Sequence, residues 1–406
     1  MKSFGVSLVV AVLLGVAVVA AAHNDDPKND QHQSQLTFLA IGDWGGVGSI
    51  SFPSEKMFGI QQRKVAAGMA KISDEINPEF VIALGDNFYY KGISGDSPYQ
   101  RVDQTFEKVY HEQPLAKVPW YVIAGNHDHY GNVTDQIQYT YYSRQRNQTD
   151  PDHVHRWEFP SLYHKQSFQR DNFTVDLILI DTVDLVVSAS LLKPDIKKGH
   201  SFWESLSLLP LRHKYGPIHT EQWTWLERSL RESTADYLLV GGHFPVFSQG
   251  MHGPTQQLVD HLKPLLEKYG AHYLSGHDHA MMHFEEQRDD EAPDNTTNNN
   301  GVRYIVTGTG NSCCSWRRNK HRKQHEKAYN DSVPLVWGLF HQDKKQSNGG
   351  NVKGGFCSFH ATPASMKVQY HDHDGNVLYE PDPILPKRTS SIVFGSSSSE
   401  GIAVDQ

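Results

Sequence analysis

The segment HYLSGHDH, from His272 to His279, places a short apolar run directly before two histidines that are separated by one residue. In an extended backbone, residues i and i+2 point to the same side, so His277 and His279 can reach one pocket. Gly276 lets the backbone turn sharply and approach its neighbours closely. By itself, a buried histidine is more often a hydrogen-bonded structural residue than a metal ligand. The segment therefore indicates a metal site only if other segments supply matching ligands.

Four other segments have the same form, a strand-like apolar run followed by glycine and a metal-binding residue type. They are Leu36–Ile41 before GDWG at 42–45, Phe80–Leu84 before GDNFY at 85–89, Trp120–Ala124 before GNHD at 125–128, and Tyr237–Val240 before GGH at 241–243. Ligands of α/β proteins gather at the carboxyl ends of the strands. A single Gly-Asp after a strand usually forms a turn, but five such segments in one chain indicate a shared site.

These segments supply enough donors for two metal ions held about 3.5–4 Å apart. The predicted ligands are Asp43, Asp86, Tyr89, Asn126, His243, His277 and His279. Asp86 is the natural bridging carboxylate, because it lies between the two groups in chain order. Anionic oxygens suit a hard trivalent ion, whereas imidazole and amide suit a divalent one. A phenol has a pKa of about 10, so only a strong Lewis acid such as Fe(III) would hold Tyr89 as phenolate at acid pH.

The remaining apolar runs complete an α/β pattern. Further strands are predicted at Val175–Ile180, Arg303–Thr307, Gly355–His360 and Met366–His371, and helices at Gln61–Ile76, Thr220–Arg231 and Thr255–Tyr269. Alternation of strands and helices predicts an α/β fold. The last strands follow one another without helices between them, so we expect a mixed sheet arrangement.

The composition is that of a globular protein, because 38% of the 406 residues are hydrophobic and 21% are charged. The formal net charge of -8 gives no sign of the basic surface that nucleic-acid binding favours. We therefore expect no nucleic-acid partner. The 24 histidines are a large enough pool to include metal ligands.

The amino terminus predicts export from the cytosol. Residues 1–22 combine Lys2, an apolar run and an Ala-rich end, which is typical of a cleaved signal peptide. The alternative is an uncleaved signal-anchor, because the run approaches the roughly 20 residues that span a bilayer. Export is consistent with five Asn-x-Ser/Thr glycosylation sequons, at Asn132, Asn147, Asn172, Asn295 and Asn330. We predict a secreted protein or one of the vacuolar lumen, with no membrane span after signal cleavage.

The rest of the chain divides into a polar linker at 23–35, a catalytic domain at 36–380 and a partly disordered tail at 381–406. Segments 186–217 and 285–301 interrupt the pattern as surface insertions. Of the three cysteines, Cys313 and Cys314 are adjacent, and adjacent cysteines rarely pair because the geometry is strained. One bridge from Cys357 to either neighbour is a pairing that the sequence leaves open, with one thiol left over.

The five motifs resemble those of the purple acid phosphatases, which are calcineurin-like metallophosphoesterases with the pattern GDxG, GDxxY, GNH(E/D), xxxH and GHxH. The resemblance runs from about Leu36 to Tyr379 and is greatest to the small single-domain form, the tartrate-resistant acid phosphatase and uteroferrin type. It implies a four-layer αββα sandwich of two mixed β-sheets flanked by helices. Tyr89 in the second motif distinguishes this family from most other metallophosphoesterases.

The resemblance also implies a role for each ligand. Fe(III) would be held by Asp43, Asp86, Tyr89 and His279. A second divalent metal, Fe(II), Zn or Mn, would be held by Asp86, Asn126, His243 and His277. His127 and His252 would be the catalytic residues, and both would bind substrate together with Asn126. The chain departs from the family in one respect, because the two cysteines that form a bridge in the small animal enzymes are absent.

The function implied is acid hydrolysis of phosphate monoesters by metal-activated hydroxide, without a Ser or Cys nucleophile. Small-molecule phosphate monoesters or phosphoproteins would be the substrates, and the enzyme would be a monomer. The alternatives are a Mn or Zn phosphodiesterase or nucleotide pyrophosphatase of the same superfamily, an iron-binding secreted protein with incidental hydrolysis, and an inactive relative that acts as a surface binding protein. Segment 186–217 would cover the site, so its removal is expected to raise activity.

Overall fold

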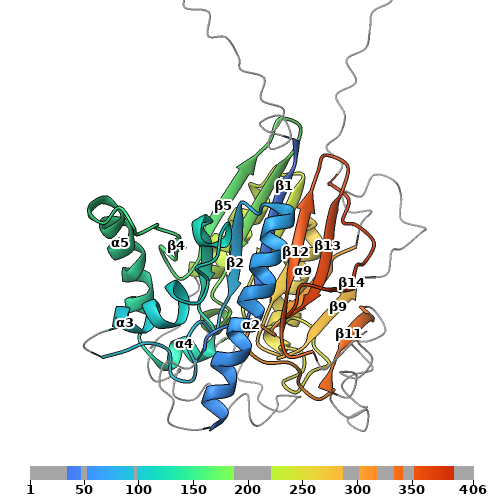
Figure 1. Ribbon diagram of the computed structural model, residues 1–406. Helices are drawn as coiled ribbons and strands as arrows, with labels where there is room; N and C mark the ends of the chain where they lie inside the picture. Colours follow the sequence, from blue (N-terminus) through green and yellow to red (C-terminus); the bar gives the residue numbers. More distant parts are fainter. Residues whose placement is uncertain are drawn as a thin grey trace, which may run out of the picture.

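The computed structural model describes residues 34–46, 53–95, 98–186, 221–286, 301–317, 333–341 and 352–387. In these residues, two seven-stranded sheets lie face to face, and helices cover their outer faces (Figure 1). None of the helices described in these ranges combines the length and the apolar composition that crossing a membrane requires.

The first sheet has parallel strands in its centre and antiparallel strands along one side. In spatial order its strands are β14 (Val377–Tyr379), β13 (Met366–Asp372), β12 (Gly355–Ala361), β1 (Leu36–Ile41), β2 (Phe80–Leu84), β3 (Trp120–Ile123) and β4 (Trp157–Glu158). Strands β1 to β4 are mutually parallel, whereas β12 pairs antiparallel with β1. The carboxyl ends of β1, β2 and β3 therefore meet at one edge of the sheet.

The second sheet has its parallel strands in the centre and antiparallel pairs on both sides. In spatial order its strands are β11 (Leu335–Leu339), β9 (Met281–Glu285), β10 (Arg303–Thr307), β8 (His272–Ser275), β7 (Tyr237–Gly241), β6 (Thr174–Leu179) and β5 (His164–Gln169). Strands β6, β7, β8 and β10 are parallel, β5 and β9 run against them, and β11 pairs antiparallel with β9 at the edge of the sheet. Both sheets are mixed, as the sequence predicts.

The helices lie outside the two sheets or in the connections. They are α2 (Pro53–Ile76), α3 (Pro98–Val102), α4 (Asn126–Tyr130), α5 (Val133–Thr149), α8 (Glu221–Arg231) and α9 (Gln256–Tyr269), with short turns η1 (Asp103–Glu107) and η2 (Leu115–Lys117). Helix α9 ends at Gly270, whose φ of 63° supplies the left-handed conformation that closes a helix. The three predicted helices correspond to α2, α8 and α9, and α2 begins earlier than expected.

Side-chain alternation along β1 produces the four layers. Phe38 and Ala40 point into an apolar core that also contains strands of the second sheet, such as Leu239 on β7. Leu39 and Ile41 point the other way, into a core shared with helix α2. Successive residues of a strand face opposite sides, so one buried strand serves two cores. A third core joins the outer face of the second sheet to α8 and α9, which confirms the αββα sandwich.

Several predicted segments fall outside the described residues, namely 1–22, almost all of the linker 23–35, nearly all of 186–217, most of 285–301 and the tail from 388 onward. Beyond the predicted domain end at 380, Ile384 pairs with Met366 through an isolated β-bridge. The sequon residues Asn132, Asn147 and Asn172 are exposed, as glycosylation requires, and the two others are not described.

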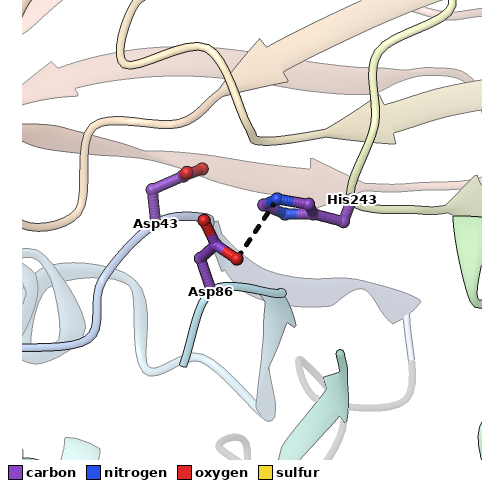
Figure 2. Close-up of side chains that lie close together, drawn as sticks. All are labelled: Asp43, Asp86 and His243. Carbon is purple, nitrogen blue, oxygen red and sulfur yellow. Dashed lines mark ion pairs between the residues drawn. The ribbon is translucent and has the colours of Figure 1, made fainter. Parts of the chain in front are cut away.

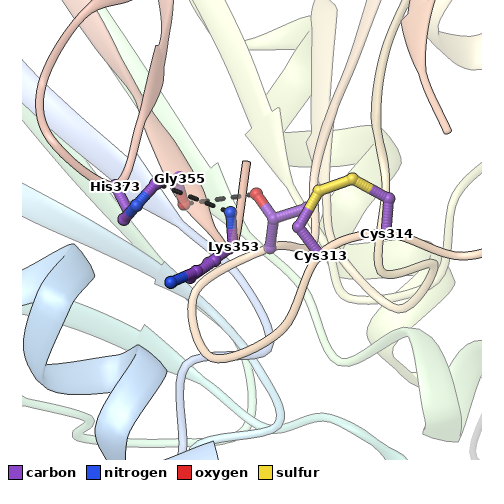
Figure 3. Close-up of a disulfide and its surroundings, with 6 residues drawn as sticks. Cys313, Cys314, Lys353, Gly355 and His373 are labelled. Atoms are coloured by element: carbon purple, nitrogen blue, oxygen red, sulfur yellow. Dashed lines mark hydrogen bonds between the residues drawn. A yellow bond between two sulfur atoms is a disulfide. The ribbon is translucent and has the colours of Figure 1, made fainter. Parts of the chain in front are cut away.

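The structure joins Cys313 to Cys314, the adjacent pairing that the sequence made unfavourable, and does not form the alternative bridge to Cys357 (Figure 3). Cys357 is a free, buried thiol on β12. Burial raises the pKa of the Cys357 thiol to about 12, so the group is unreactive at neutral pH. The N–H of Cys313 donates to the carbonyl of Lys353 at 3.0 Å, which ties the bridged pair to the segment that precedes β12.

Candidate metal centre

The predicted ligands converge because the carboxyl ends of the parallel strands in both sheets face one another. Asp43 follows β1, Asp86 follows β2, and Asn126 begins α4 after β3. From the second sheet, His243 follows β7 and His277 follows β8. Asp43, Asp86 and His243 each offer an atom within 4.8 Å of the others, in a buried position where an ion could bind (Figure 2).

One group of donors surrounds His243. Its Nδ1–H donates to the carbonyl of Leu84 at 2.8 Å, which fixes the orientation of the ring. Nε2 then lies 3.4 Å from Oδ1 of Asp86 and 3.1 Å from Oδ1 of Asn126. Two oxygens that can only accept thus meet one imidazole nitrogen, so either a proton on this nitrogen or a metal cation must lie between them. This geometry fits a divalent cation held by imidazole, amide and carboxylate.

A second group of donors surrounds Tyr89. Its hydroxyl donates to Oδ1 of Asp43 at 2.9 Å and lies 3.0 Å from Nε2 of His279. That Nε2 is 3.4 Å from the same Asp43 oxygen. Asp86 also forms a hydrogen bond with Tyr89, so this carboxylate touches both groups and is placed to bridge them. Phenol and carboxylate oxygens beside one imidazole fit a hard, highly charged cation.

His277, which follows β8 of the second sheet, contacts residues of both donor groups. Its N–H donates to Oδ2 of Asp43 at 2.7 Å, so β8 and β1 are joined at the site. Its ring centroid lies 5.2 Å from that of His243 and 4.2 Å from that of His252. All seven predicted ligands are thus brought together, together with His252.

The backbone at the site is held in an unusual conformation. Asp43, Asp86 and His277 have φ values of 54°, 51° and 69°, in the left-handed region that residues with a side chain seldom adopt. Such conformations persist only where the surrounding structure enforces them, and they concentrate at functional sites. Two glycines that directly precede ligand residues allow the ligand-bearing segments to approach one another closely. A Cβ on Gly125 would collide with Asp86, and a Cβ on Gly276 would collide with Asp43.

The electrostatics keep Asp86 ionised and His277 neutral, the states that bind cations, but they favour the protonated form of Tyr89. Burial opposes ionisation of Asp86, but the imidazoles of His243 and His127 outweigh it and hold the pKa of this carboxyl below its usual value. Burial and the surrounding histidines lower the pKa of His277 well below the ordinary value, so the ring is neutral. Burial, with the charges of Asp43 and Asp86, raises the pKa of Tyr89 well above that of a free phenol. A phenolate there requires a strongly charged cation.

The two predicted catalytic histidines lie beside different residues of the site. The N–H of His127 donates to Oδ1 of Asp86 at 2.9 Å, and its ring Nδ1 donates to the carbonyl of Tyr90 at 2.6 Å. Its Nε2 is 4.0 Å from Oδ2 of Asp86. The N–H of His252 donates to Oδ1 of Asp278 at 3.1 Å. Asp278 therefore orients the loop that carries His252.

Sequence reasoning missed the residues that hold the ligand-bearing segments in place. Asp128 is fully buried and accepts from the N–H groups of Asn87, Phe88 and Gly125 at 3.0, 3.1 and 2.8 Å. It thus joins the GDNFY segment to the GNHD segment. The sequence shows Asp128 at the end of GNHD, but it gives no sign that this carboxylate accepts hydrogen bonds from the GDNFY segment.

A similar connection joins the two sheets. Asp181, which follows β6, lies 2.7 Å from Nε2 of His129 on α4, and both side chains are buried. The next residue, Thr182, accepts through Oγ1 from the N–H groups of His243 and Phe244 at 3.2 and 2.9 Å. No spacing in the sequence indicated these contacts, because they join elements far apart in the chain.

Comparison with known proteins identifies the family. The signature described as Calcineurin-like phosphoesterase matches residues 36–281. The chain belongs to the calcineurin-like phosphoesterase family. This phosphoesterase is 34% identical over 359 residues to tartrate-resistant acid phosphatase type 5 of Oryctolagus cuniculus, covering 88% of this chain and 92% of the relative. It is 29% identical to purple acid phosphatase 7 of Arabidopsis thaliana, covering 90% of each chain.

A solved structure shows the same fold. It is described as GAP50, the anchor in the inner membrane complex of Plasmodium, and it matches with a TM-score of 0.57 and 19% identity, over 88% of this chain and 90% of that one. The resemblance drawn from the five motifs is thereby confirmed at the level of the family, and the phosphoesterase belongs among the purple and tartrate-resistant acid phosphatases. It is an enzyme of the acid phosphatase class.

Proposed function

We propose that this acid phosphatase hydrolyses phosphate monoesters at a binuclear centre that pairs Fe(III) with a divalent metal, Fe(II), Zn or Mn. The observation that carries the proposal is the position of Tyr89, whose phenol oxygen lies 2.9 Å from Asp43 and 3.0 Å from His279. The phenol oxygen, a carboxylate oxygen of Asp43 and an imidazole nitrogen of His279 meet there. The Asp86 carboxylate contacts both this group and the His243 group. Relatives named acid phosphatases support the same class of reaction.

When bound, the two metals supply the Lewis acidity that lowers the pKa of water and neutralises charge on the phosphate. The protein supplies the positions. Asp43, Tyr89 and His279 would hold one metal and Asn126, His243 and His277 the other, with Asp86 shared. The left-handed backbone at Asp43 and Asp86 fixes these carboxylates before substrate arrives, so little reorganisation is needed during the reaction.

His127 and His252 bind the substrate phosphate and donate the proton that the leaving group takes up. Nδ1 of His127 is occupied by the Tyr90 carbonyl, so Nε2 is the atom that faces the centre. The His252 ring lies against the His277 ring, and its loop is held by a hydrogen bond to Asp278. When protonated, either ring can contact phosphate oxygens and donate a proton to the leaving alkoxide. Direct attack by water requires no Ser or Cys nucleophile.

The proposal includes export from the cytosol and glycosylation, with the mature enzyme acting as a monomer in an acidic, extracellular or vacuolar compartment. It is supported by the signal-like pattern at 1–22 and by the exposure of Asn132, Asn147 and Asn172. Treatment with an N-glycosidase should lower the apparent mass of the exported protein. An unchanged mass, with the initial methionine still present, contradicts this part of the proposal.

The decisive experiment combines metal analysis, a visible spectrum and turnover on the purified protein. We expect about one Fe and one further metal per chain, a broad visible absorption band from the phenolate ligand, and hydrolysis of p-nitrophenyl phosphate near pH 5. Bis(p-nitrophenyl) phosphate and a nucleotide pyrophosphate serve as parallel substrates.

Three outcomes separate the alternatives. A colourless protein that contains Mn or Zn and prefers the diester identifies a phosphodiesterase. A coloured protein with stoichiometric iron but no turnover identifies an iron-binding protein. A protein that binds no metal and hydrolyses nothing is an inactive relative with a binding role. Each of the three contradicts the proposed monoesterase.

A further inference from the structure

Arg101 connects the two segments that carry the oxygen ligands of the Tyr89 group. One nitrogen of its guanidinium, Nη2, donates to the carbonyl of Gly46 at 2.5 Å and to the carbonyl of Tyr89 at 2.9 Å. Gly46 lies three residues after Asp43 in the chain, and Tyr89 is the last residue of the GDNFY motif. Both acceptors are backbone oxygens, so this one side chain bridges the two segments through their main chains.

The same two segments are also joined at their first residues. The N–H of Asp43 donates to the carbonyl of Gly85 at 3.0 Å, and the N–H of Gly45 donates to the carbonyl of Asp86 at 3.1 Å. These backbone bonds hold the two carboxylate ligands next to each other. Arg101 acts further along the second segment, at the residue whose phenol oxygen reaches the centre.

The core beneath α3 holds Arg101 in position. The residue that follows it, Val102, is buried in the same apolar core as Trp44 and Phe88, which are chain neighbours of two predicted ligands. The guanidinium carbon of Arg101 lies 6.0 Å from the centre of the Phe88 ring, at the limit of cation–π attraction. The guanidinium therefore approaches the two carbonyls from a packed element.

A guanidinium has the chemistry that this position requires. It only donates hydrogen bonds and is always charged in proteins, whereas a carbonyl oxygen only accepts. Hydrogen bonds from a charged donor are stronger than those between neutral groups. Since Nη2 already donates to two carbonyls, this nitrogen is committed to the protein backbone and not to a substrate phosphate.

We propose that Arg101 is a positioning residue for the iron site, which holds the backbone of Tyr89 against the Asp43 segment and thereby sets where the phenol oxygen lies. The inference rests on the proposed Fe(III)–M(II) function, because it concerns the ligand that would bind iron. The phenol oxygen is at the far end of a rigid ring, so a small rotation of the Tyr89 backbone moves this oxygen by a larger distance. Arg101 itself contacts neither the metal nor the substrate in this role.

The test removes the donors of Arg101 and follows the iron site directly. Arg101→Met keeps much of the side-chain volume but loses the guanidinium. We expect its affinity for Fe(III), measured by competition with a chelator, to fall about 10- to 100-fold, as for other residues that orient metal ligands. At saturating iron, the phenolate absorption band should be weaker per bound iron, because its intensity depends on how the phenolate oxygen meets the metal. Native affinity with a native band in Arg101→Met would overturn the proposal.

The second metal position provides a comparison within the same protein. Its predicted ligands Asn126 and His243 lie on other segments than the two that Arg101 bridges. Iron-saturated Arg101→Met should therefore bind Zn with nearly native affinity. Thr182→Val removes the hydroxyl that supports the His243 segment, so it should weaken Zn binding and leave the iron band native. Equal losses at both metal positions in Arg101→Met would indicate a general loosening of the fold and contradict the assignment.

A conservative variant and a matched control complete the series. Arg101→Lys keeps a charged donor without the fork of the guanidinium, so it should restore part, but not all, of the iron affinity lost in Arg101→Met. Arg170 donates through Nε to the carbonyl of Gln35 at 2.9 Å, at the amino end of β1 and thus away from the metal centre. Arg170→Met should leave iron affinity and the band native. A loss there as large as in Arg101→Met would mean that removing any such guanidinium has this effect, against the proposal.

Turnover separates a positioning role from a contact with substrate. A higher KM for p-nitrophenyl phosphate in Arg101→Met, with native iron affinity and a native band, would make Arg101 a substrate contact and reject the positioning role. If Arg101→Met does not fold, as judged by circular dichroism, Arg101→Lys takes its place, and native iron affinity in that variant rejects the proposal.

The native protein distinguishes failure of this inference from failure of the function on which it rests. Native protein that binds iron and shows the band, with both unchanged in Arg101→Met, leaves the Fe(III)–M(II) function standing while the role of Arg101 fails. Native protein that binds no iron and shows no band contradicts the proposed function itself, and the role of Arg101 falls with it.

Discussion

Tyr89 differs from other buried tyrosines of this protein in what its hydroxyl contacts. The Tyr139 hydroxyl also donates to a carboxylate, that of Glu107 at 2.9 Å, and the other charges that act on it are those of Arg146 and Arg156. At Tyr89, two carboxylates and a histidine surround the oxygen, and burial with these charges raises the pKa of the phenol. The same group that resists ionisation in an empty site becomes a strong ligand once a highly charged cation is bound.

Replacing Tyr89 by Phe should therefore abolish the visible absorption band without unfolding the protein. The ring is kept, so packing against His127 is preserved, whereas one anionic ligand is lost. We expect iron affinity and turnover to fall at least tenfold, as observed when metal-site partners are removed. Spectra and metal content of Tyr89→Phe are compared with those of Tyr139→Phe, in which a buried carboxylate-bound hydroxyl is removed elsewhere. A band that persists in Tyr89→Phe excludes this residue as the ligand.

His272 makes stability depend on pH at a distance from the metal centre. Burial, and then the charge of Arg303, lowers the pKa of His272 to about 3, and its Nδ1 accepts from the N–H of Arg303 at 3.1 Å. The unfolded chain binds a proton at an ordinary pKa of about 6.5, so stability is lost as pH falls from about 6.5 towards 3. At pH 5 this single group should cost about 2 kcal/mol relative to neutral pH.

His272→Asn keeps an acceptor for Arg303 but removes the titrating ring. We expect the free energy of unfolding, measured in urea at pH 7 and pH 5, to fall less with acid in this variant than in the native protein. The exposed His111 provides the control, because His111→Asn should leave the pH dependence as it is. If the free energy of unfolding falls equally between pH 7 and pH 5 in the native protein and in His272→Asn, the buried ring does not set the pH dependence of stability.

At the scale of the elements, the connection after β6 organises the second sheet's part of the site. Thr182 accepts from the N–H groups of His243 and Phe244, and the preceding Asp181 contacts His129 on α4. Two adjacent residues thus hold the segment that carries His243 and the helix that begins with Asn126. The ligands of the second metal depend on this connection, although neither residue touches the metal position.

Thr182→Val should weaken binding of the second metal. Valine has nearly the same shape but offers no oxygen to two buried N–H groups, so the His243 segment loses its support. We expect the affinity of the divalent site to fall about 10- to 100-fold, which is typical of residues that orient metal ligands. Titration of the iron-loaded protein with Zn measures this affinity, and Thr182→Ser, which keeps the hydroxyl, is the control. Native affinity in the valine variant would contradict the assignment.

The elements that carry the ligands were the easiest to predict from sequence. Strands β1 and β2 are buried on both faces and read as unbroken apolar runs, so Leu36–Ile41 and Phe80–Leu84 were predicted at their observed bounds. The missed elements lack such a signal. Strand β5, at His164–Gln169, lies at a sheet edge and is half-exposed, and its sequence HKQSFQ is largely polar. Only its pairing with β6 makes it a strand.

Contacts between distant segments could not be predicted from the sequence, because they too depend on which segments the fold brings together. The ligand types and their glycines have local signals, because a turn and a close approach require particular residues at particular positions. The carboxylate of Asp128 and the hydroxyl of Thr182 act on N–H groups that other segments bring to them. The pairing of Cys313 with its neighbour, and not with Cys357, likewise depends on where β12 buries Cys357. Periodicity and spacing contain no information about such encounters.

At the scale of the whole molecule, the metal centre joins the two sheets. Asp43 and Asp86 come from the first sheet, and His243 and His277 from the second, with the buried carboxylates between them. The N–H of His277 that donates to Asp43 is a direct bond between the layers. Buried carboxylates are costly without a compensating charge, so the native fold and the bound metals stabilise each other.

Removing the metals should therefore lower the melting temperature of the entire domain and not only its activity. A ligand present at a thousand times its dissociation constant contributes about 4 kcal/mol, which corresponds to a shift on the order of 10 °C. Thermal unfolding is followed by circular dichroism before and after treatment with a chelator and a reductant, and again after iron and zinc are restored. Asp43→Asn, which lacks one ligand charge, should respond much less to the treatment. A native protein that melts at the same temperature with and without metals would show that the two sheets hold together independently of the centre, and that the buried carboxylates are compensated by the protein alone.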